Sequence, residues 1–141
     1  MKFIVSIFSV VFIFLFSLNA MAADNVERNL YEKMLDTSAL TKSGISYKDY
    51  EKITQDLVVS YSRYERAGLK KGKAGYYLER ANLNFMLAKD IWTDLLDTKS
   101  QLREKTTDTL LRLEDIQSQR LNGAWERANQ ALSDYGKLKR K

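Results

Sequence analysis

The segment at residues 68–75, GLKKGKAG, has residue types that could bind a phosphate group. A nucleotide-binding loop follows the pattern G-x-x-x-x-G-K-[ST] and lies between a buried strand and a helix. Here three residues, not four, separate Gly68 from Gly72, and Ala74 stands where the pattern needs a magnesium-binding hydroxyl. The preceding sequence, YSRYERA, continues a helical pattern rather than a strand. The segment is therefore not expected to bind a nucleotide.

A weaker binding role remains for the same segment. Its lysines come just before an expected helix, whose free backbone N–H groups attract anions. Two arginines lie shortly before it, so five cations could together hold a headgroup phosphate or an acidic partner surface: Arg63, Arg66, Lys70, Lys71 and Lys73. The alternative is a solvated turn in which the lysines serve only solubility.

Tyr76 and Tyr77 follow this cluster directly. Adjacent residues on a helix point in different directions, so both rings cannot face the interior. Aromatic rings beside basic side chains are typical of surfaces that contact protein partners. We therefore add these two tyrosines to the candidate binding residues, with one of them expected at the surface.

The sequence contains no histidine and no cysteine. It therefore lacks an imidazole base, a thiolate nucleophile, a disulfide and the common ligands for zinc, copper and haem. Asp90 and Asp94 share one face of an expected helix, but a solvated surface accounts for them. We expect a protein that is not an enzyme and that uses no cofactor and no metal.

Residues 1–22 have the order of a secretory signal peptide: a positive start, an apolar run at 3–18 and the small-residue motif AMA. Cleavage after this motif would leave residues 23–141 as a single helical-bundle domain. We therefore expect export, to the periplasm or the extracellular space. The alternative is that residues 3–23 remain as an uncleaved single-pass membrane anchor, because a stretch of this length can span a bilayer.

Basic residues outnumber acidic ones by 23 to 18. In an exported protein this excess favours an anionic envelope surface or an acidic protein as the partner, rather than nucleic acid. A positive charge of this size is also compatible with solubility alone.

Helical spacing of apolar residues runs through the remaining chain, which contains no proline. The expected helices cover residues 25–40, 46–67, 75–104 and 107–138. Gly44 and Gly68 are placed to end the first two. Each of the first two helices has one apolar side. In the first helix this side consists of Val26, Leu30, Met34 and Leu40. In the second helix it consists of Tyr50, Ile53, Leu57, Tyr61 and Tyr64.

The last two helices carry the most regular apolar seams, with steps of three and four residues. The first seam comprises Leu78, Ala81, Phe85, Ala88, Trp92 and Leu95; the second comprises Leu110, Leu113, Gln117, Leu121, Ala124, Ala128, Ala131, Tyr135 and Leu138. Their phase changes near residues 98–107, which is compatible with a turn or with a stutter in one continuous helix. We favour a turn, because a single long helix would leave its seam uncovered.

The predicted fold is therefore all-α, an antiparallel bundle of three to four helices with a long coiled-coil-like C-terminal hairpin. The predicted function is that of an exported adaptor, chaperone-like protein or envelope-complex subunit, which binds another macromolecule through an exposed helix face or through residues 68–77. A protein is the expected partner, and the seams would also allow a homo-oligomer. The alternatives are a binder of anions or membrane surfaces and a membrane-anchored subunit.

Overall fold

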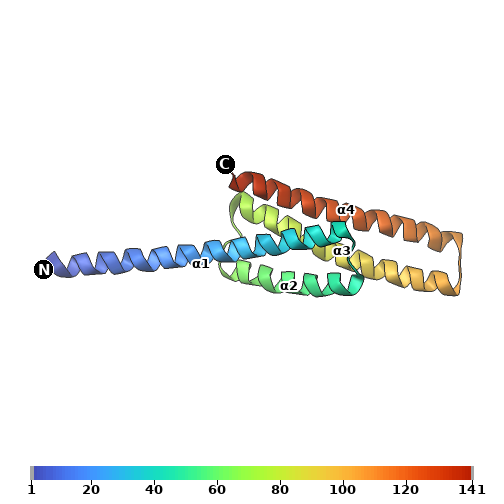
Figure 1. Cartoon of the computed structure of the whole chain (residues 1–141), viewed down its shortest axis with the longest axis horizontal. Helices are drawn as coiled ribbons and strands as arrows, with labels where there is room; N and C mark the ends of the chain where they lie inside the picture. Colours follow the sequence, from blue (N-terminus) through green and yellow to red (C-terminus); the bar gives the residue numbers. More distant parts are fainter. Residues whose placement is uncertain (1, 141) are drawn as a thin grey trace.

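The computed structural model describes the backbone of residues 2–140 and the side chains of residues 23–140. This part of the chain contains four helices and no strand (Figure 1). The helices are α1 (Lys2–Ser43), α2 (Tyr47–Arg66), α3 (Gly72–Glu104) and α4 (Asp108–Lys139). Each helix folds back on the previous one, and α3 and α4 form the most extensive pair. The predicted all-α bundle with a long C-terminal hairpin is confirmed.

The helices do not all have the same extent along the bundle (Figure 1). The N-terminal half of α1 projects beyond the other helices at one end, where α4 also finishes. At the opposite end, the tip of the α3–α4 hairpin extends past the turn between α1 and α2. All four helices therefore lie side by side from the end of α4 to the α1–α2 turn, and only α3 and α4 continue to the hairpin tip.

Local sequence signals set the helix boundaries. Gly44 and Gly68 have φ angles of 85° and 71°, a left-handed conformation that favours glycine after a helix. The Ser46 Oγ accepts a hydrogen bond from the Asp49 backbone N–H at 3.2 Å and so caps α2. The Thr107 Oγ1 accepts one from the Leu110 N–H at 3.3 Å, which caps α4. This cap starts α4 after a three-residue turn, so the fold-back is confirmed.

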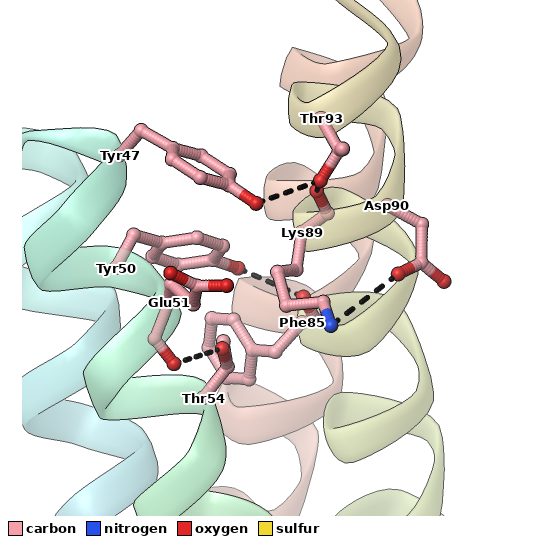
Figure 2. A network of polar contacts seen from close by, with 8 residues as sticks. All are labelled: Tyr47, Tyr50, Glu51, Thr54, Phe85, Lys89, Asp90 and Thr93. Carbon is pink, nitrogen blue, oxygen red and sulfur yellow. Dashed lines mark hydrogen bonds and ion pairs between the residues drawn. The ribbon is translucent and has the colours of Figure 1, made fainter.

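The predicted seam of α3 lies in the core, with Trp92 half-buried. Phe85 is fully buried, and its backbone carbonyl accepts a hydrogen bond from the Tyr50 hydroxyl at 2.9 Å (Figure 2). Beside it, the rings of Trp92 and Trp125 stand edge to face with centroids 5.4 Å apart. Tyr47 contacts α3 about two turns beyond Phe85, with its hydroxyl 2.8 Å from the Thr93 hydroxyl (Figure 2). Aromatic contacts thus stabilise the packing of the start of α2 against the middle of the hairpin.

Two residues predicted to be buried are exposed instead. Leu40 is 41% exposed, because Thr37 and Ser38 occupy the core side of α1 there. Leu113 is 40% exposed, because in this part of the hairpin only α3 is available to cover the seam of α4. Both errors arise from packing that the apolar spacing of a single helix does not contain.

The start of α3 and the extent of α1 also differ from prediction. Helix α3 begins at Gly72 rather than at residue 75, so Lys73 lies on the helix and the loop is shorter than expected. Helix α1 continues without interruption from Lys2. The side chains of the predicted signal peptide lie outside the described residues. Between residues 23 and 140, no helix has both the length and the apolar character needed to cross a membrane.

Gly75 lies where α3 meets the preceding loop. A Cβ atom there would be 2.9 Å from the carbonyl carbon of Lys70 and 3.1 Å from its Cα, both backbone atoms. We expect Gly75→Ala to lower the free energy of unfolding by about 1–3 kcal/mol, because the loop backbone must move. Urea denaturation measures this change.

Gly123→Ala is the matched control in α4. There the nearest atom to an added Cβ would be Nη1 of the flexible Arg127 side chain, at 3.3 Å. We expect the control to be neutral or to gain up to about 1 kcal/mol from the better helix former. A Gly75→Ala variant as stable as this control would contradict the close contact.

Candidate functional site

The five predicted cations do not form one free cluster. The Lys70 ammonium pairs with Glu79 at 2.6 Å and with Glu65 at 3.3 Å, and it lies 6.0 Å from the Tyr61 ring centroid. The hydrogen bonds that the Lys70 ammonium donates to these two carboxylates raise the pKa of Lys70. Lys70 therefore links α2 to α3, and its charge is compensated within the chain.

The other four cations are exposed and have no ion pair within the described residues: Arg63, Arg66, Lys71 and Lys73. The Arg66 Nε donates to the Ser62 carbonyl at 3.3 Å, which leaves the rest of its guanidinium free. These residues remain available to an anionic partner. They lie around the α2–α3 loop and the first turn of α3.

Tyr76 and Tyr77 differ in exposure, as expected for adjacent residues on a helix. Tyr76 is 55% exposed, and its hydroxyl accepts a hydrogen bond from Arg80 Nη1 at 3.2 Å. Tyr77 packs against the hydrophobic core, with its ring centroid 5.6 Å from that of Tyr76. Only Tyr76 is therefore presented to a partner.

The α2–α3 loop is held by Tyr64, whose hydroxyl donates to the Leu69 carbonyl at 2.7 Å. Burial raises the pKa of Tyr64 from 10.0 to about 12. Above pH 10 the unfolded chain loses this proton while the folded chain keeps it, so folding stability must fall as pH rises. We expect the free energy of unfolding to decrease between about pH 10 and pH 12.

Tyr64→Phe identifies the contribution of this hydroxyl, because it removes the titrating group and keeps the ring. We expect the variant to be less stable at neutral pH and to lose part of the decrease above pH 10. Urea denaturation at a series of pH values measures both effects. An identical pH dependence in the two proteins would show that Tyr64 does not keep its proton in the folded state.

A groove that the sequence did not predict runs along the outer side of the α3–α4 hairpin. It is lined by Leu87, Ile91, Ile116, Gln119, Arg120, Gly123 and Arg127, and we call it the hairpin groove. The core seams pair α3 with α4, and α1 and α2 pack on the hairpin from the other side. The hairpin groove is therefore left uncovered in the single chain.

The hairpin groove exposes large apolar side chains. Leu87 is 40% exposed and Ile116 is 52% exposed, on opposite sides of the groove. Leu83, one turn before Leu87 on α3, is 60% exposed and extends the apolar surface. Gly123 leaves room between the helices because it has no side chain. Exposed apolar residues gathered in a groove are typical of a site for another macromolecule.

Arginines border this apolar surface. Arg120 and Arg127 line the hairpin groove, and the Arg127 Nε donates to the Asn84 Oδ1 at 3.0 Å, which bridges α4 to α3. The helical repeat puts Arg80 two turns before Leu87 and Arg112 one turn before Ile116, on the same side. None of the four has an ion pair within the described residues. The groove is therefore apolar along its length and cationic at its borders.

The sequence itself contains a signal for this groove. Leu83, Leu87 and Ile91 recur at four-residue steps on α3, while Ile116 and Gly123 are one heptad apart on α4. These positions lie outside the main seams. A second apolar stripe on a helix already supplied with a core seam predicts a second contact surface.

Three comparisons with known proteins assign neither a family nor a function to this chain. No protein-family model, no curated protein and no solved structure matches this chain. Among the residues with described side chains, no group of three or more histidine, cysteine, aspartate or glutamate residues is placed to hold a metal ion. The class defined by the fold is that of an all-α antiparallel helical bundle, and its candidate site is the hairpin groove.

Proposed function

We propose that this chain is an exported, non-enzymatic helical-bundle protein that binds another protein in the hairpin groove. The observation that carries this proposal is the combination of exposed Leu87 and Ile116 with unpaired Arg120 and Arg127 in one groove. Burying those two apolar side chains would contribute favourable free energy, and the arginines would select the partner.

The chemistry of the groove defines the partner. A groove between two helices accepts the apolar side of a third helix, with contacts repeating every three or four residues. The arginines along the borders favour a helix whose apolar stripe is flanked by glutamate or aspartate. We therefore propose an acidic amphipathic helix as the bound segment. Arginine is among the residues that contribute most to such interfaces.

The hairpin groove accounts for partner binding better than residues 68–77 do. Lys70 is paired with two carboxylates, and Tyr77 packs against the core. The exposed apolar surface near the loop is mainly that of Tyr76. The groove offers several apolar side chains in a row, which is what a helical partner requires.

A comparison of two double variants tests this proposal. We expect Leu87→Asp with Ile116→Asp to abolish capture of a partner from a lysate of the source cell, because the acids repel an acidic helix and remove apolar contact. Val58→Asp with Val59→Asp is the control, since both valines are about half exposed on α2, away from the groove. Equal capture by the two variants, or equal loss, would contradict the proposal.

The export component of the proposal has its own test. N-terminal sequencing of the protein recovered from cells is expected to begin at Ala23. A start at residue 1 or 2 would contradict cleavage and support the membrane-anchored alternative. This result is independent of whether the groove binds a partner.

A further inference from the structure

Three segments far apart in the sequence meet at the end of the bundle where α1 leaves it (Figure 1). The Lys139 ammonium lies 2.6 Å from the Glu27 carboxylate, and the Tyr135 hydroxyl donates to the same carboxylate at 2.5 Å. These contacts fix the last turns of α4 against α1. Arg63 of α2 lines a shallow pocket with Asn25 of α1, which places the end of α2 there as well.

This end carries a concentration of positive charge. Residues 63–73 contain five basic side chains against one acidic, and residues 134–140 contain three against one. The cations exposed there without an ion pair among the described residues are Arg63, Arg66, Lys71, Lys73 and Arg140, and we call this set the basic end. The opposite end, residues 97–115, contains four basic side chains and five acidic ones. The basic excess is therefore localised.

Two further features of the basic end suit an anionic surface. Helix α3 starts there, and its N-cap residue Lys71 makes no side-chain capping hydrogen bond, so the first backbone N–H groups remain available. Tyr76, in the second turn of α3, is exposed beside Arg80. Exposed tyrosines near basic residues are typical of the interface between a membrane and water.

The direction of α1 identifies the kind of anionic surface. Helix α1 continues from the bundle toward residue 2 without a break, and the apolar run of the sequence occupies residues 3–18. Before cleavage after Ala22, a bilayer that holds this run lies nearer to the basic end than to any other part of the bundle. Basic residues immediately beside a membrane segment are attracted by anionic lipid headgroups.

We propose that the basic end docks on an anionic membrane surface through Arg66, Lys71 and Lys73, with the hairpin tip directed away from the lipid. The interaction is electrostatic, so it requires anionic lipid and weakens with added salt. It does not depend on partner binding in the hairpin groove. Arg66, Lys71 and Lys73 do not line the hairpin groove, and the chain can therefore engage both surfaces.

Flotation with lipid vesicles tests this inference on the chain beginning at Ala23. All the core residues of the described part lie between Leu30 and Tyr135, so this chain keeps the core intact. The vesicles contain phosphatidylcholine and phosphatidylglycerol at roughly three to one, with pure phosphatidylcholine as the neutral comparison. We expect binding to the anionic vesicles alone, with loss of binding between about 0.05 M and 0.5 M salt.

Two triple variants, each of which removes three positive charges, test which end of the bundle binds the vesicles. We expect Arg66→Gln, Lys71→Gln and Lys73→Gln together to weaken vesicle binding on the order of 100-fold. The control removes three exposed, unpaired lysines at the other end of the bundle: Lys42→Gln, Lys48→Gln and Lys105→Gln. We expect it to bind within about threefold of the unmodified chain.

Three outcomes would overturn the inference: equal binding to neutral vesicles, equal weakening in both triple variants, and displacement by soluble glycerol phosphate. The last would indicate a site for a small anion instead of a membrane surface. A negative result with vesicles would not contradict partner binding in the hairpin groove, because none of the substituted residues lines the groove. Loss of partner capture by the groove variants would likewise leave vesicle binding unchanged.

Discussion

Replacing Phe85 by alanine is expected to lower the free energy of unfolding by about 4 kcal/mol. The Phe85 side chain is fully buried on the α3 seam, so its removal creates a cavity that neighbouring side chains fill only in part. The backbone carbonyl of the same residue anchors the Tyr50 hydroxyl, and the substitution loosens this junction (Figure 2). Urea denaturation followed by far-ultraviolet circular dichroism measures the loss.

Leu83→Ala is the control for this substitution, two residues away on the same helix. Leu83 is largely exposed and contacts solvent, so we expect a change within about 0.5 kcal/mol. A comparable loss of stability in the two variants would mean that Phe85 does not occupy the centre of the bundle. The two residues would then have exchanged faces, and the predicted seam would be wrong.

Reversing the charge of the hairpin groove is expected to weaken partner binding at least 100-fold. Arg120→Glu with Arg127→Glu places two carboxylates where the acidic helix of the partner would lie, and buried arginine contacts commonly contribute about 2 kcal/mol or more each. Arg127 also loses its hydrogen bond to Asn84, which costs the folded protein little because both residues are partly or fully solvated. Isothermal titration calorimetry with the captured partner measures the affinity.

Arg103→Glu with Lys105→Glu is the matched control. Both residues are exposed at the hairpin tip, and the double substitution makes the same change in net charge. We expect it to weaken binding less than about threefold, since the charges lie outside the groove. Similar weakening by both variants would indicate that the partner responds to net charge and not to the groove.

Local chemistry made the helices predictable from the sequence. The Ser46 hydroxyl and Asp49 signal the start of α2, and Gly44 and Gly68 adopt the left-handed conformations that helix ends need. Thr107 made the hairpin turn recognisable without glycine or proline. Each signal operates within a few residues, so a single sequence contains all of it.

Buried polar residues limited the prediction of the core. Thr37 and Thr98 are buried, although neither belongs to an apolar pattern. Each hydroxyl donates to the carbonyl four residues earlier, Lys33 at 2.9 Å and Asp94 at 3.0 Å, so its burial leaves no unpaired donor. The apolar pattern alone therefore predicts Leu40 on the core side of α1 and does not predict the burial of these two threonines.

The candidate site depended on tertiary structure that the sequence does not contain. The hairpin groove is open because α1 and α2 pack on the other side of the hairpin, and no local pattern specifies that choice. The role of Lys70 depends on Glu79, which lies on the next helix. Within the basic end, only Arg140 depends on tertiary structure, because the end of α4 lies beside the α2–α3 loop.

The central claim is that a partner helix lies between Leu87 and Ile116, and site-directed photocrosslinking tests it most directly. Because the chain contains no cysteine, one cysteine introduced at position 87, 116 or 58 carries a photoreactive maleimide at a single place. We predict adducts from positions 87 and 116 with one and the same protein, through an acidic amphipathic segment, and none from position 58. Adducts from position 58 alone, or only with a second copy of this chain, would contradict the account.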